Sequence, residues 1–305
     1  MLIWLVLIPL IAAALIGLCK APARPTALLS ASLTLALGIW ALVSFDGCSS
    51  CWSRFEGMDL QLTLAPALSK VMLLLTILVT FATVLGTNPP QGGEASWYNS
   101  ALLISAGATG AFLSDNIISF FAFHELALIP TFVMIGLYGR GDRRTTAWRA
   151  TLYLGLASMV LLAALLMIGT QAGFTFSGLK DFMASGRELA HAELIGALLI
   201  AGFGTLISLF PFHSWAAPAY ASAPAPVAMM HAGVLKKFGL YGLFMFQPLM
   251  ETGFLPWTNI LLVLLVCNVI WVGYVTVNQK RLDLLLGNSS VMHMEIHRSE
   301  ERRVG

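Results

Sequence analysis

A carboxylate, Glu125, lies inside a long apolar stretch of the sequence, IISFFAFHELALIPTFVMIGL (residues 117–137). A helix of about 20 apolar residues crosses the hydrocarbon core of a bilayer, so this stretch can hold the acid at membrane depth. An acid there costs about 2.5–3.5 kcal/mol on insertion scales and is rarely left facing lipid. Pro130 predicts a bend one turn beyond the acid. Glu125 is therefore a candidate for binding and releasing a proton; the alternative is a packing kink with the carboxylate capped by a neighbouring helix.

Candidate bases, Lys236 and Lys237, lie in a second apolar segment, VAMMHAGVLKKFGLYGLFMF (227–246). Consecutive helical residues point about 100° apart, so the two amines diverge. Lys237 shares an i, i+4 stripe with Gly233 and Tyr241, which favours it as the buried amine, and Lys236 is expected to face another polar cavity or a partner subunit. At an effective dielectric constant near 20, charges about 4 Å apart interact by about 4 kcal/mol, so a proton at one site can change occupancy at the other.

Histidines near these groups are candidates for a proton relay. His124 precedes Glu125, is expected to point away from it, and could be either a packing residue or a proton carrier. His213 and His231 flank a proline-rich break in LISLFPFHSWAAPAYASAPAPVAMMHAG (206–233). A broken helix at membrane depth is tolerated where it lines a cavity or is buried in protein. For His213 a place in a cytoplasmic turn stays equally open, whereas the apolar helix around His231 favours a buried polar role.

The elements that must position these residues are membrane helices. The chain is 58% hydrophobic and only 10% charged, with a mean hydropathy of +0.81. Soluble domains have about 25% charged residues, so composition indicates an all-α polytopic membrane protein. The apolar segments predict about nine spans, each long enough to be a membrane helix. They cover residues 1–19, 27–45, 66–86, 100–114, 117–137, 149–170, 193–210, 224–247 and 257–278.

Positive charge in alternate loops predicts the orientation, because cytoplasmic loops are enriched in Lys and Arg. One set of loops holds eight basic residues, including the run YGRGDRRTTAWR after the helix of Glu125, and the other set holds three. The N-terminus is therefore expected outside. The first apolar segment has no preceding positive charge and is expected to be a retained helix rather than a cleaved signal peptide.

No motif for a cofactor or a metal is present. The sequence contains no phosphate-binding glycine loop after a strand, no haem site and no iron–sulfur spacing. Cys48 and Cys51 lie in a loop that is expected outside, where a disulfide is possible, and a metal there would need further ligands. The loop 171–193 contains an amphipathic run that predicts either a short interfacial helix or a solvated linker.

The segments FFAFHELALIPTFVMIGLYG, LFPFHSWAAPAYASAPAPVAMMHAGVLKKFGLYG and RLDLLLGNSSVMHM together resemble the antiporter-like membrane subunits of bacterial NADH-quinone oxidoreductase, or respiratory complex I, and most of all its subunit M branch. The resemblance covers roughly residues 100–294. It implies a bundle of about fourteen helices with two inverted five-helix repeats. Residues 1–99 would be N-terminal helices, 100–247 the first repeat and 257–294 the start of the second.

The same resemblance implies roles for individual residues. Glu125 corresponds to the family's membrane glutamate, and Lys237 corresponds to the lysine that follows the broken helix and links two half-channels. The family usually has another lysine within the broken helix, and the aligned position here is Leu206. After Met294 the family continues with further membrane helices, whereas this chain ends in the polar run EIHRSEERRVG. Residues 295–305 are therefore expected to be a non-native tail on a truncated chain.

Together, these expectations predict that the protein is a proton-translocating subunit of a bacterial inner-membrane NADH-quinone oxidoreductase. Protons would move along Glu125, Lys237 and water, with Lys236, His231 and His213 as further relay candidates. The expected partners are other membrane-arm subunits, lipid, protons and water, with no nucleic acid and no cofactor of the chain's own. The alternatives are a cation/proton antiporter, a membrane-hydrogenase subunit of the same architecture, or a structural subunit that does not pump.

Overall fold

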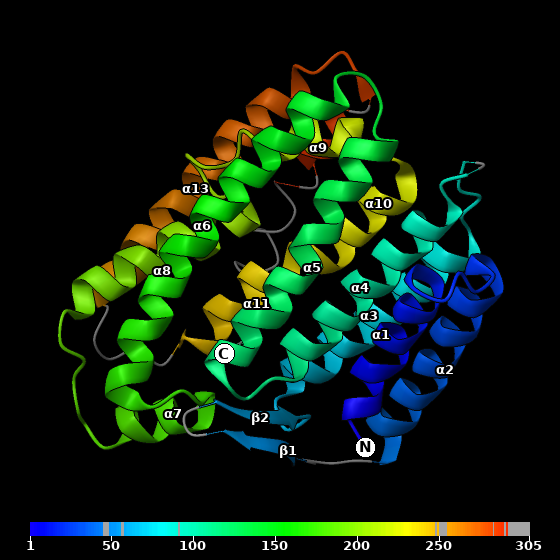
Figure 1. Ribbon diagram of the computed structural model, residues 1–305. Coiled ribbons are helices and arrows are strands. Elements are labelled where there is room, and N and C mark those ends of the chain that lie inside the picture. The colour runs from blue at the N-terminus through cyan, green and yellow to red at the C-terminus, as the bar shows by residue number, and fades with distance from the viewer. Residues whose placement is uncertain are drawn as a thin grey trace. The chain divides into compact units, whose positions relative to one another are not determined.

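The computed structural model describes residues 1–44, 49–55, 58–90, 92–247, 249, 255–282, 284–289 and 291 (Figure 1). It confirms the predicted all-α membrane class, because long apolar helices make up most of the described chain. These residues divide into two compact units. The first contains Met1–Met134, Phe174–Gly178 and Ala225–Phe238, and the second contains Ile135–Gly173, Leu179–Pro224 and Gly239–Gly305.

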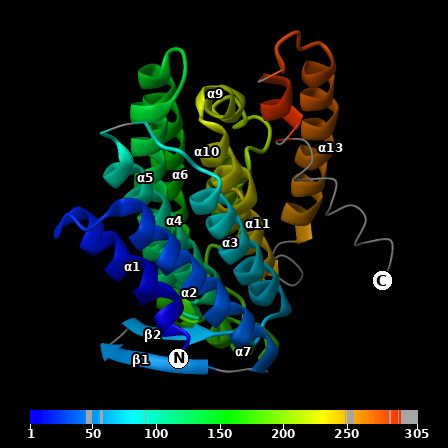
Figure 2. The same ribbon diagram turned by 90° about the vertical axis from the view of Figure 1, so that its right-hand side faces the viewer.

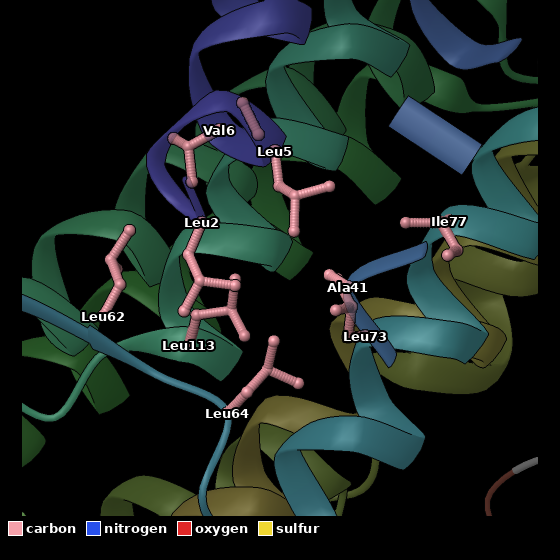
Figure 3. Close-up of a cluster of buried hydrophobic side chains, with 10 residues drawn as sticks. Leu2, Leu5, Val6, Ala41, Leu62, Leu64, Leu73, Ile77 and Leu113 are labelled. Carbon is pink, nitrogen blue, oxygen red and sulfur yellow. The ribbon is translucent and has the colours of Figure 1, made fainter. Parts of the chain in front are cut away.

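The first unit begins with four helices that pack against one another. They are α1 (Ile3–Gly17), α2 (Ala23–Ser44), α3 (Ala67–Leu85) and α4 (Glu94–Leu113). Helix α1 packs against α2 and α4, and α3 packs against the same two helices. Figure 3 shows a cluster of buried side chains among these helices and the strand β2: Leu2, Leu5, Val6, Ala41, Leu62, Leu64, Leu73, Ile77 and Leu113. Such a cluster stabilises the unit through close van der Waals packing, because lipid tails are as apolar as leucine and leave little hydrophobic drive between membrane helices.

Helix α5 (Ile117–Tyr138), which carries Glu125, packs closely against α4 at two glycines of α4. A Cβ atom at Gly107 would lie 2.6 Å from the carbonyl oxygen of Phe123 and 2.8 Å from the amide nitrogen of Ala127. A Cβ atom at Gly110 would lie 2.5 Å from the ring of Phe123. Small residues at such positions let two membrane helices approach at backbone distance, so they fix the helix on both sides of the acid.

A β-hairpin precedes α3 at the end of the first unit where α1 begins (Figure 2). Its strands, β1 (Ser49–Phe55) and β2 (Met58–Thr63), pair antiparallel, and the helical patterns of the sequence did not predict them. Cys51 lies in β1, while Cys48 lies outside the described residues, so the disulfide stays a prediction.

The start of α5 is held by main-chain hydrogen bonds from two other segments. The Asp115 amide donates to the Gln61 carbonyl at 2.9 Å, and the Asp115 carbonyl accepts from the Phe176 amide at 2.8 Å. The Asn116 side chain then caps the helix, because its Oδ1 accepts from the amide of Ile118 at 2.9 Å and from the amide of the next residue at 3.0 Å. These bonds satisfy donors that a helix leaves unpaired at its start.

The second unit contains α6 (Arg143–Ala172), α8 (Ala192–Ile207), α9 (Ala216–Ser222) and α13 (Leu255–Val277). Helix α6 packs against α8 and α9, and α13 packs against α8. Gly202 of α8 allows the closest approach, since a Cβ atom there would lie 2.9 Å from the Cβ of Leu161 on α6. Asp142 caps α6 by accepting from the Thr145 amide at 3.3 Å.

Among the described residues, five helices are long and apolar enough to cross a membrane: α2, α3, α5, α6 and the Asn259–Val277 part of α13. Helices α1 and α8 are apolar but shorter. Each predicted span has a helix at its position, while the exact number of spans stays a prediction. A helix, α7 (Phe176–Ala184), occupies the loop that predicted one, and its place at the membrane interface also stays a prediction.

Candidate proton-transfer site

The carboxylate of Glu125 is paired with the imidazole of the preceding residue. His124 Nδ1 lies 3.3 Å from Glu125 Oε1, and the exposed fractions of the two side chains are 0% and 33%. The expectation that His124 points away from Glu125 was wrong. The 100° angle applies to the Cα–Cβ directions, and two long side chains can rotate until their tips meet.

Aromatic rings surround the imidazole of His124. The Phe238 ring stands at 87° to it with centroids 5.1 Å apart, and the Phe120 ring lies nearly parallel at 6.4 Å. Phe121 contacts it at 6.3 Å, and Phe112 packs behind Phe238 at 4.9 Å. Edge-to-face and offset contacts of this kind restrict ring rotation. The imidazole is therefore held in an apolar setting, and the carboxylate oxygen of Glu125 that faces it is buried as well, although a third of that side chain is exposed.

The candidate lysines follow a π-helical turn. Helix α10 (Ala225–Met230) continues into η1 (His231–Leu235) and then into α11 (Lys237–Met245). The Lys236 amide donates to the His231 carbonyl, five residues back, at 3.0 Å. A π turn holds an extra residue compared with an α turn, so residues after it are rotated relative to an ideal α-helix.

That rotation overturns the expected burial of the two lysines. Lys236 is only 1% exposed and is among the largest fully buried side chains, whereas Lys237 is half-buried. The i, i+4 stripe that favoured Lys237 assumed an uninterrupted α-helix, which the structure does not have at this point. His231 is buried, as expected, and its helix packs against α3, where a Cβ atom at Gly233 would lie 3.0 Å from Val79.

The predicted helix break is present in the second unit. Helix α8 ends at Ile207, and Ser208 takes a left-handed conformation with φ of 65°. Across the break, the Trp215 indole N–H donates to the Thr205 carbonyl at 3.1 Å. His213 is partly exposed and stacks on Phe210, with centroids 5.8 Å apart. Non-helical backbone inside a membrane bundle needs such partners, and the tryptophan supplies one.

Leu206, at the position where the family usually has lysine, is a buried packing residue of the second unit. It is 4% exposed, and a Cβ atom at Gly239 would lie 3.1 Å from its own Cβ. Burial at this position suits a leucine, because a charged amine in the same place would have to be desolvated.

The first unit thus contains Glu125, His231, Lys236 and Lys237, while His213 belongs to the second unit. The roles of all five stay predictions. Sequence reasoning undervalued His124, and the signal that could have raised its rank was a second titratable side chain beside a membrane carboxylate.

Comparison with known proteins identifies the family. Residues 114–297 match the model of the family described as NADH:quinone oxidoreductase/Mrp antiporter, TM. A curated relative from Microcystis aeruginosa, NAD(P)H-quinone oxidoreductase chain 4 2, is 32% identical over 234 residues, which cover 74% of this chain and 41% of the relative. The chain therefore spans less than half the length of that relative.

Solved structures show the same fold. A chain of respiratory complex I from Thermus thermophilus with bound NADH matches with a TM-score of 0.85 and 25% identity, over 97% of this chain and 63% of that one. A chain of the Mrp complex from Dietzia sp. matches with a TM-score of 0.81 and 22% identity, over 95% of this chain and 32% of that one. The family match covers more than half of this sequence and agrees with the fold. The chain belongs to the NADH:quinone oxidoreductase/Mrp antiporter transmembrane family.

Proposed function

We propose that the protein is a proton-translocating membrane-arm subunit, of the subunit M type, in a bacterial NADH-quinone oxidoreductase. It lies in the inner membrane with its N-terminus outside, binds no NADH and carries no electrons. The observation that supports this most directly is Glu125, an ionisable group in an apolar helix, in contact with a second ionisable group at 3.3 Å. Intramembrane ionisable residues of this kind usually serve an ion or proton path.

In this proposal Glu125 takes up and releases the transported proton. Lys236, Lys237 and His231 belong to the same compact unit and provide further proton-binding groups along a hydrated route. Redox events in partner subunits change the electrostatic environment of the acid, and the interaction between neighbouring charges converts that change into proton release. The fully buried Lys236 is the amine whose charge is least screened by solvent.

Three hydrogen-bonded segments support the proposed topology. The β2 strand, the loop before α5 and the segment before α7 are joined by main-chain bonds among Gln61, Asp115 and Phe176. The distribution of Lys and Arg assigns all three segments to the outer side of the membrane. Segments joined by backbone hydrogen bonds must lie on the same side, so the fold agrees with the alternation of the loops.

The substitution Glu125→Gln at the chromosomal gene tests the proposal. The amide matches the carboxylate in size but cannot take up a proton, so NADH-driven proton translocation in inverted vesicles falls to about a tenth or less, as for the loss of a positioned proton-transfer group. Native gels check that the complex assembles. A normally assembled complex with an unchanged ratio of protons to electrons would contradict proton translocation through Glu125.

A structural subunit that does not pump is the second candidate, and Leu206 favours it. This side chain replaces the lysine that the family usually places in the broken helix, and it is packed among apolar neighbours. If the subunit is structural, Glu125→Gln leaves both quinone reduction and the proton ratio unchanged, whereas deletion of the gene abolishes assembly. The Mrp match shows the fold alone, so a cation/proton antiporter is tested by whether Na⁺ gradients affect the activity.

A further inference from the structure

His124 is the buried ionisable residue that the proposed pathway does not use. It has 0% exposure, and its Nδ1 lies 3.3 Å from the Glu125 carboxylate. Within the part of the chain that the structure describes, neither ring nitrogen of His124 makes a hydrogen bond. Its polar contact is the carboxylate. A ring needed only for packing would be served better by phenylalanine, because burying an unsatisfied ring nitrogen is unfavourable.

We propose that His124 and Glu125 form a proton-sharing pair, in which the imidazole takes the proton that the carboxylic acid releases and later returns it. In the forward step the O–H bond of protonated Glu125 breaks and an N–H bond forms at His124 Nδ1. The product is a carboxylate beside an imidazolium, with the same number of protons and the same total charge. This inference rests on the proposed function, because it adds a second proton position to the same site.

The surroundings of His124 and Glu125 permit proton exchange between the two side chains and limit which of them is charged. A charged imidazolium in an apolar setting is unfavourable alone but is stabilised by an adjacent carboxylate, so His124 holds the proton only when Glu125 has lost it. Rings of Phe120, Phe121 and Phe238 hold the imidazole in place. The two facing atoms, His124 Nδ1 and Glu125 Oε1, are both buried, and their separation of 3.3 Å is close to the range of about 2.6–3.2 Å for proton transfer.

The pair therefore gives the transported proton two positions. One is on the carboxylate of Glu125, whose side chain is one-third exposed, and the other is on the fully buried imidazole within the aromatic packing. Movement between them leaves the net charge of the site unchanged, so it avoids the penalty of creating an isolated charge in the protein interior.

Two substitutions at the chromosomal gene separate proton sharing from positioning and packing. In His124→Asn, the amide can occupy the place of Nδ1 and hydrogen-bond to Glu125, but it cannot take up a proton. In His124→Phe, the aromatic packing is kept and both nitrogens are lost. We expect NADH-driven proton translocation to fall to about a tenth or less in both variants, as in Glu125→Gln.

The outcomes distinguish this inference from the proposed function. Normal translocation in His124→Asn would overturn proton sharing, since a hydrogen bond would then be sufficient, and normal translocation in His124→Phe would reduce the residue to packing. If Glu125→Gln itself has no effect, the proposed function fails first. His191→Asn is the matched control: His191 is exposed and has φ of 58°, a conformation that asparagine tolerates, and no change is expected.

Infrared difference spectroscopy of the native complex provides a second test, in which His124 is left unchanged and Glu125→Gln serves to assign the bands. With histidine labelled with ¹⁵N in the ring, redox cycling should give imidazole bands that shift with the label and accompany the carboxylic acid band of Glu125. Both sets of bands should be absent in Glu125→Gln. A carboxylic acid band that changes without any imidazole band would overturn the proton-sharing pair.

Discussion

At the scale of single residues, burial separates two lysines that are adjacent in sequence. The amine of Lys236 belongs to a side chain that is 1% exposed, and the neighbouring Lys237 is half-buried. The sequence identified both residues and the acid, because charges in apolar segments are visible directly. It could not rank the lysines, since the ranking depends on a π turn that leaves no local signal in the residue types. Likewise, the pairing of His124 with Glu125 depends on side-chain rotation rather than on spacing.

Charge-conserving substitutions test this difference in burial. Lys236→Arg forces a larger planar head into a filled space and should reduce the free energy of unfolding by about 1–3 kcal/mol. Lys237→Arg retains contact with its surroundings and should change it by about 0.5 kcal/mol or less. Thermal unfolding of the purified complex measures both variants. Equal effects would show that the two side chains are equally confined in the assembled complex.

At the scale of elements, the helices and the proline-rich break were predictable, and the hairpin was not. Long apolar runs specify membrane helices almost unaided, because lipid leaves the backbone few alternatives. Strand β1 (SSCWSRF) does not alternate polar and apolar residues strictly, so the antiparallel pair as a whole could not be recognised. Strand β2 (MDLQLT) does alternate strictly, and this period-2 pattern was the available signal for one strand. The close contact between α4 and α5 was also invisible, although it is the contact that places the helix of Glu125.

A glycine pair tests the contribution of that helix contact. Gly107→Ala places a methyl group 2.6 Å from the Phe123 carbonyl oxygen, which the backbone of α5 can relieve only by moving away. We expect a loss of about 1–3 kcal/mol in stability together with impaired proton translocation. Gly155→Ala in α6 is the control, because nothing lies within 4 Å of its added methyl group. That control should be neutral or more stable by about 0.5–1 kcal/mol, and a similar defect in both variants would argue against helix separation.

At the scale of the whole molecule, the arrangement of loops about the membrane is a prediction from the distribution of Lys and Arg. The structure contains no bilayer, so orientation is tested by labelling. In a background without native cysteines, Ser185→Cys should react with a membrane-impermeant maleimide in intact cells. Arg144→Cys, in the first turn of α6 next to the basic loop after α5, should react only in inverted vesicles. The reverse pattern would place the N-terminus in the cytoplasm and invert the direction of the proposed proton path.

Main-chain hydrogen bonds from Asp115 to Gln61 and from Phe176 to Asp115 hold the start of α5. Because these bonds use only backbone groups, they survive most substitutions at the three positions. Every non-proline residue carries the same donor and acceptor, so side chains at these positions can vary among relatives without releasing the helix. Proline is the exception, because it has no N–H to donate. Random mutagenesis of this stretch should therefore recover diverse functional replacements at residue 115 and large apolar ones at residue 176, whose buried ring packs edge-on against Phe120. Proline should be missing from both positions.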